Sequence, residues 1–174
     1  MSTDTTTTPK RPVFRLAGIA EIKHLNVRKE GPDDEKILAV DVKLAFTKVD
    51  RALCAYFDEA LEAFLWRAES GGIMAARNGF MHPVAYANAI TSASVKIDGA
   101  SFVGCEVKKF ALQPRDGGTV DVTCSVSLYP SSGDIAELAK RVQDGARVEI
   151  EGPPDLFDGD GDGGAAAAGN TSTT

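Results

Sequence analysis

The side chains that most often carry chemistry are few in this chain. It contains three cysteines, Cys54, Cys105 and Cys124, and two histidines, His24 and His82. A thiol beside an imidazole is the arrangement of a cysteine nucleophile, and Cys54 with His82 is the pair to consider. Cys54 lies in an apolar helical pattern, however, so packing explains it more simply. The sequence has no HExxH, CxxC or Gly-x-Ser-x-Gly motif and no phosphate-binding glycine loop. We therefore expect a protein that is not an enzyme and that uses no cofactor.

One segment has the spacing of a metal-binding loop. Asp158, Asp160 and Asp162 alternate with glycine, which matches the first half of a calcium loop. The bidentate glutamate that closes such a loop is replaced by Gly169, and no amphipathic helices flank the segment. We therefore expect an acidic tail and no metal site. The odd number and wide spacing of the cysteines predict neither a zinc site nor a disulfide framework.

The negative charge of the chain is concentrated near its end. The formal net charge is −6, from 19 basic and 25 acidic residues. The segment 151–174 contains acidic residues and no lysine or arginine, so the rest of the chain is nearly neutral. Overall acidity disfavours a protein that binds duplex DNA mainly by neutralising phosphates. It is compatible with a local basic groove and an acidic tail.

The composition divides the chain into three parts. Residues 1–11 are rich in threonine and predict a disordered arm, and residues 12–151 are expected to form a single folded domain. Residues 152–174, rich in Asp, Gly, Ala and Thr, predict a disordered acidic tail because they can bury little apolar surface. No apolar run approaches the ~18 residues of a membrane span, and no signal peptide is visible. We expect a cytoplasmic protein.

Alternation of apolar and polar residues predicts strands over 38–46 and 120–128, and a short last strand over 147–150. The pair Asp98-Gly99 between two apolar runs predicts a tight hairpin, since both residue types tolerate positive φ.

Apolar residues at helical spacing predict two helices. The first covers 50–68 and carries Trp66 near its end, and the second covers 133–143. Ser131 and Asp134 have the spacing of a capping box at the start of the second helix.

Residues 20–27 resemble residues 105–112. In both segments the apolar phase changes midway, which predicts a β-bulge at the equivalent place. A polar turn, an alternating strand and a helix follow each segment. The order predicts an α+β fold, namely an antiparallel sheet or partly open OB-like barrel built from two β-β-α units. Chance similarity between two hairpins followed by helices is the alternative, and the sequence leaves it open.

Basic and aromatic residues gather on the repeated segments and on the linker between the helix and the next strand. Basic grooves with aromatic platforms are typical of proteins that bind single-stranded nucleic acid. The candidate binding residues are Lys23, His24, Arg28, Lys29, Arg77, Phe80, Tyr86, Lys108, Lys109 and Arg115. The alternative for the lysines is a solvated outer surface, and for Phe80 and Tyr86 a cover over the core.

The strand 121–129 running into the helix over 134–138, together with the acidic tail, resembles phage single-stranded DNA-binding proteins. The resemblance implies an OB fold and non-enzymatic binding of single-stranded DNA in replication or recombination, in the host cytoplasm. It also implies that the tail modulates binding by covering the DNA groove, and that it recruits replication or recombination proteins. The tail departs from the family pattern because Phe157 comes early and the chain ends in Thr-Ser-Thr-Thr.

A second hypothesis is a protein–protein interaction or assembly subunit, either a homo-oligomer or a host-directed inhibitor. Internal pseudo-symmetry and strand edges serve assembly. The apolar stripe of the helix over 50–68 is broad, and Trp66 at its end is a candidate interface residue. Packing of Trp66 against the linker 71–80 is the alternative. A small-molecule or metal binder has the least support, because no polar cluster converges in the sequence.

Overall fold

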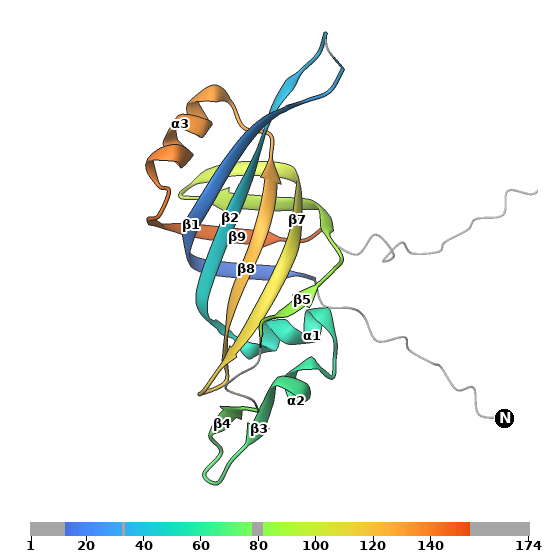
Figure 1. The fold of residues 1–174 in the computed structure, drawn as a ribbon, viewed down its shortest axis with the longest axis vertical. Coiled ribbons are helices and arrows are strands. Elements are labelled where there is room, and N and C mark those ends of the chain that lie inside the picture. The colour runs from blue at the N-terminus through green and yellow to red at the C-terminus, as the bar shows by residue number, and fades with distance from the viewer. Residues whose placement is uncertain (1–12, 33, 78–81, 154–174) are drawn as a thin grey trace, which may run out of the picture.

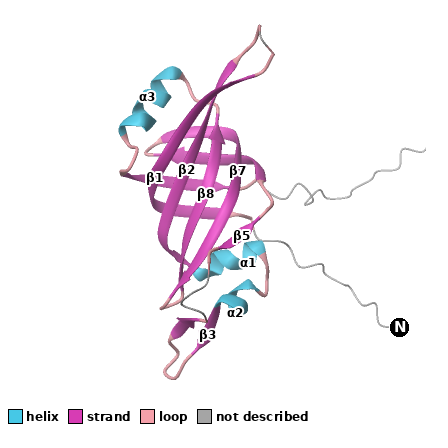
Figure 2. Ribbon diagram, viewed as in Figure 1, coloured by secondary structure: helices cyan, strands magenta, loops and turns pink. Residues whose placement is uncertain are grey.

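The structure is a computed structural model that describes residues 13–32, 34–77 and 82–153. Strands make up most of it (Figure 2). The elements in chain order are β1 (Arg15–Glu30), β2 (Ile37–Asp50), a 3₁₀ turn (Arg51–Leu53), α1 (Cys54–Phe57), α2 (Leu61–Leu65), β3 (Trp66–Ala68), β4 (Met74–Ala76), β5 (Val84–Tyr86), β6 (Ile90–Ile97), β7 (Ala100–Arg115), β8 (Thr119–Leu128), α3 (Ser132–Lys140) and β9 (Gly145–Glu151). The arm predicted over 1–11, and the tail predicted over 152–174 from residue 154 onward, lie outside the described residues.

The large sheet is antiparallel and closes on itself. Its strands follow the order β7-β6-β9-β1-β2-β8, β8 pairs again with β7, and the short β5 adds to β7. In Figure 1, β1, β2, β8 and β7 form one layer, and α3 lies at the opposite end of the molecule from α1 and α2. The predicted antiparallel sheet is confirmed, with less helix than expected.

Strand alternation builds the core inside this closed sheet. Val42 and Leu44 of β2, and Val122, Cys124 and Val126 of β8, are all buried. The polar residues between them point outward. The strands predicted over 38–46, 120–128 and 147–150 are confirmed within β2, β8 and β9. The predicted hairpin is also confirmed, because Asp98 (φ 47°) and Gly99 (φ 94°) link β6 to β7.

Both predicted β-bulges are present. The register of β1 against β2 shifts between Ile22 and His24, and that of β7 against β8 shifts between Lys108 and Ala111. A further shift occurs in β2 between Phe46 and Val49. Each bulge lets the apolar side chains keep facing the core where the strand changes phase. Duplication of a β-β-α unit stays a prediction.

The long helix predicted over 50–68 is wrong. Asp50 caps a 3₁₀ turn by accepting from the Ala52 N–H at 2.8 Å, but the helix stops at Asp58, whose backbone is extended. The Asp58 carboxylate accepts from the Ala60 N–H at 2.7 Å, a local bond that competes with helix continuation. The chain turns helical again only over α2. The apolar residues of this segment are therefore divided between two short helices and a strand.

The break changes which aromatic residue is buried. Trp66 begins β3 and is 1% exposed, whereas Phe64 on α2 is 57% exposed. The Trp66 indole Nε1–H donates to the carbonyl of Arg115 at 2.8 Å. The interpretation of Trp66 as an interface residue is therefore wrong, because the side chain is buried within the chain and its indole N–H is already hydrogen-bonded there.

Short helices cover the two ends of the closed sheet. At one end α1 contributes Phe57 to an aromatic cluster with Phe14, Tyr86 and Phe110, with ring centroids 4.9 to 6.3 Å apart. At the other end, the predicted capping box between Ser131 and Asp134 opens α3. Among the described residues, the helices are too short and too polar to cross a membrane.

Candidate nucleic-acid interface

The outward side chains of β1, β2, β8 and β7 form one continuous surface, which we call the outer face. Strand register fixes how they line up. His24 lies opposite Lys43, Lys43 opposite Ser125, and Ser125 opposite Lys108. Neighbouring strands are about 4.8 Å apart, so this row crosses the face over about 14 Å. We call these four residues the basic row.

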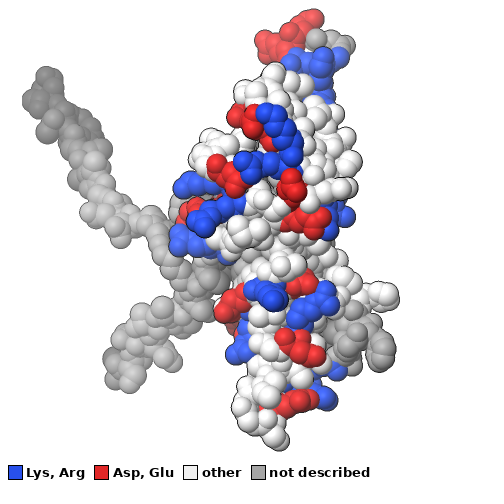
Figure 3. All heavy atoms as spheres, turned by 90° about the vertical axis from the view of Figure 1, so that its left-hand side faces the viewer, with Lys and Arg blue, Asp and Glu red and all other residues white. Residues whose placement is uncertain are grey.

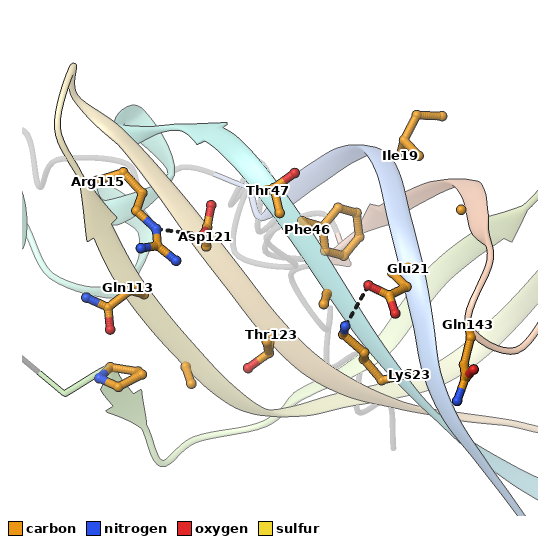
Figure 4. Close-up of a pocket in the computed structure, with 14 residues that line it drawn as sticks. Ile19, Glu21, Lys23, Phe46, Thr47, Gln113, Arg115, Asp121, Thr123 and Gln143 are labelled. Atoms are coloured by element: carbon orange, nitrogen blue, oxygen red, sulfur yellow. Dashed lines mark hydrogen bonds and ion pairs between the residues drawn. The ribbon is translucent and has the colours of Figure 1, made fainter.

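A second row runs beside the first and consists mostly of small side chains. Ala45 lies between Glu21 and Thr123, and Thr123 lies opposite Ala111. Because these side chains are small, the surface is hollowed here into an open groove of about 640 Å³. Figure 4 shows polar side chains around the groove, and its lining also includes Lys23, Thr47, Gln113, Arg115, Asp121 and Gln143.

Ion pairs hold several charged groups of the outer face in place. Lys23 Nζ lies 2.6 Å from Glu21 Oε2, and Arg115 Nε lies 2.7 Å from Asp121 Oδ2, as the dashed lines in Figure 4 show. Lys108 pairs with the carboxylate of Glu106. Every one of these pairs has at least one exposed member, so each is worth about 1 kcal/mol or less and can be exchanged for another partner.

Three lysines of the outer face have no carboxylate partner among the described residues, namely Lys43, Lys48 and Lys109. Their charges leave this face with a positive surplus. On the adjacent side of the molecule, which faces the viewer in Figure 3, basic and acidic side chains alternate without a large area of one sign.

The structure brings five of the predicted binding residues together on the outer face: Lys23, His24, Lys108, Lys109 and Arg115. Arg28 lies farther along β1, half-buried, and its guanidinium is held by Asp41 at 2.9 Å and by Glu30 at 2.7 Å. Lys29 is exposed near the end of β1, beyond the basic row.

Two predicted residues make contacts within the chain. Tyr86 is half-buried and packs its ring edge-to-face with Phe57, with centroids 4.9 Å apart. The Arg77 Nε–H donates to the carbonyls of Ala63 (2.9 Å) and Trp66 (3.0 Å), which holds the end of α2. Phe80 lies outside the described residues.

Sequence reasoning missed Lys43 and Lys48. Lys43 occupies an outward position of a strand that was correctly predicted, so its direction was available from the alternation. What the sequence did not give was the pairing of β2 with β8, which places Lys43 between His24 and Ser125.

The cysteines are buried, and their thiols are not disposed to ionise. Cys54, Cys105 and Cys124 are at most 1% exposed and form no disulfide. Burial raises the pKa of the Cys54 thiol from 9.0 to about 11, and the charge of Glu62 adds to the shift. Burial alone raises the pKa of Cys105 to about 11 and of Cys124 to about 12. A nucleophilic cysteine needs the opposite shift.

We expect the folded protein to resist thiol reagents at about pH 8, because the thiolate is the reactive form. Timed reaction with a chromogenic disulfide should show slow release from the native protein and rapid release in denaturant. The unfolded chain loses its thiol protons first, so the free energy of unfolding should fall as the pH rises from 9 to about 11. Rapid release from one thiol of the native protein would contradict this assignment.

The part of the chain that the structure describes contains no cluster of histidine, cysteine, aspartate or glutamate side chains suited to a metal ion. The calcium-like segment at 158–163 lies outside that part. No protein-family model, curated protein or solved structure matches the chain.

Proposed function

We propose that this protein binds single-stranded DNA, without catalysing a reaction, on the outer face of β1, β2, β8 and β7. One observation carries the proposal: the basic row, which contains Lys43 and Lys108, lies directly beside a row of mostly small side chains, across strands of one closed sheet. Phosphates and bases need these two kinds of surface side by side. The closed antiparallel sheet also supports an OB-like interpretation of the fold.

In the bound state the phosphates lie along the basic row and the bases lie over the groove. Lys43 has no carboxylate partner within the described residues, so it takes a phosphate without losing an ion pair. Lys23 and Arg115 exchange Glu21 and Asp121 for phosphate oxygens. Thr123 and Gln113 offer hydrogen bonds to base edges. Binding of this kind releases counterions and weakens as salt rises.

The direct test is fluorescence anisotropy with a labelled oligodeoxythymidine of about 30 nucleotides, long enough to cover the ~4–16 nucleotides that one OB fold occupies. We expect saturable binding at low salt, with log affinity falling linearly with log salt concentration. A duplex of the same length should bind more weakly, because stacked, paired bases cannot lie over the groove. Absence of binding at low salt would refute the proposal.

We further propose that the acidic tail lowers DNA affinity. Asp155, Asp158, Asp160 and Asp162 lie outside the described residues, just beyond Gly152, whose N–H donates to the carbonyl of Phe14 at 2.8 Å. Replacing the four aspartates by asparagine should raise affinity for oligodeoxythymidine by about tenfold at low salt, since a tethered anion competes with phosphate. The gain should vanish at high salt, where the competition is screened. Equal affinities at low salt would contradict it.

Assembly into oligomers is the second candidate. The hairpin formed by β1 and β2 carries two exposed apolar side chains, Val27 (49%) and Ile37 (55%), and Tyr129 beside it is 50% exposed. Sedimentation velocity over a range of concentrations measures this directly. A monomer at micromolar concentration would remove the assembly function and leave the DNA-binding proposal unchanged.

A further inference from the structure

Lysines occupy the bulges of three strands of the outer face. Lys23 lies in the bulge of β1, Lys48 in that of β2 and Lys109 in that of β7. A bulge places two residues opposite one, so it adds a side chain to the surface and changes the direction in which that side chain points. Here the added side chains include cations, on strands that border the groove or the basic row.

The backbone at two of these lysines is unfavourable for their residue type. Lys48 has φ 56° and Lys109 has φ 57°, which is the left-handed region where glycine or asparagine is the usual residue. The local structure enforces this conformation. The Lys48 N–H donates to Asp121 Oδ1 at 3.1 Å, and the residue after Lys109, Phe110, is buried and pairs with Tyr86 of β5. A strained residue that is not glycine is a reason to look for a function of its side chain.

Protection of a sheet edge does not explain Lys109. Lysine is common on edge strands, where its charge discourages pairing with another chain. β7 is paired on both sides at this position, with β5 through Phe110 and with β8 through Ala111. Neither Lys48 nor Lys109 has a carboxylate partner within the described residues. Both ammonium groups are therefore exposed, unpaired and placed by a bulge.

We propose that Lys48 and Lys109 are phosphate contacts on the two sides of the groove, so that the nucleic-acid backbone crosses the strands instead of running along one of them. The inference rests on the proposed function. Along β8, Lys48 lies at the level of Val120 and Asp121, and Lys109 lies at the level of Cys124. The groove with Thr123 lies between these two levels.

Glycine substitutions test the inference without harming the fold. Lys48→Gly and Lys109→Gly remove the cation and also relieve the left-handed backbone, so their melting temperatures should equal or exceed that of the natural protein. Each should weaken binding of the labelled oligodeoxythymidine about threefold to tenfold at low salt. Each should also reduce the magnitude of the salt slope by about 0.7, the value for one phosphate of a single strand. Lys109→Arg should keep the affinity, because it keeps the charge.

Ser92→Gly is the matched control. Ser92 also has φ 57°, in an irregular part of β6, which does not belong to the outer face. It should gain stability in the same way and bind DNA as the natural protein does. If the natural protein binds but both lysine variants keep its affinity and salt slope, the inference is wrong and the proposed function stands. If the natural protein does not bind at low salt, the proposed function itself has failed.

Discussion

Reversing two charges of the basic row should weaken binding of single-stranded DNA by about 1,000-fold at low salt. The variant is Lys43→Glu combined with Lys108→Glu, on the strands that flank β8. Each reversal removes an attraction to phosphate and adds a repulsion, and each of these is worth about 1 kcal/mol at contact distance in water. Both side chains point outward, so the core and the melting temperature should change little. Anisotropy titrations at several salt concentrations measure the effect.

The control carries the same change in net charge elsewhere. Lys96→Glu with Lys140→Glu alters β6 and α3, away from the outer face. It should weaken binding only slightly, because these charges act on the DNA only through the long-range field of the protein. If the two double variants lose the same affinity, binding follows net charge and the outer face is not the site.

The sequence predicted the strands well because alternation is a local signal. In β8 every second residue from Val120 to Leu128 is buried, as the pattern required. The bulges near Ile22 and Lys108 were also predicted, since a phase change in the apolar pattern has few other causes. The prediction of one helix over 50–68 was wrong because the spacing of apolar residues does not reveal where the backbone leaves the helical conformation. The break depends on Asp58, whose carboxylate satisfies the N–H of Ala60.

The candidate site was predicted in part for the same reason. The lysines of β1 and β7 were found because they lie on similar segments of sequence. Their meeting on one face depends on β2 and β8 pairing between them, which is a long-range contact that no local pattern encodes. Binding by Tyr86 and Arg77 stays a prediction, because an aromatic and a basic residue in a linker look alike in the sequence whether they bind a ligand or hold the linker in place.

The largest loss of stability from a single substitution is expected at Trp66. Trp66→Ala should lower the free energy of unfolding by about 3–5 kcal/mol, because it empties a buried aromatic position. It also leaves the Arg115 carbonyl without the indole donor. Urea unfolding followed by circular dichroism measures this, since the variant lacks the only tryptophan of the chain. Phe64→Ala, two residues earlier and 57% exposed, should change stability by less than about 1 kcal/mol.

The same substitution connects stability to the candidate site. The hairpin of β3 and β4 holds the turn between β7 and β8 by three bonds: Trp66 to the Arg115 carbonyl at 2.8 Å, Ala76 N–H to Asp116 Oδ1 at 3.0 Å, and Gly117 N–H to the Met74 carbonyl at 2.8 Å. Arg115 borders the groove from this turn. Under conditions where Trp66→Ala is still folded, we expect it to weaken DNA binding about as much as Arg115→Ala does. Unchanged binding would show that the turn does not depend on Trp66 to position Arg115.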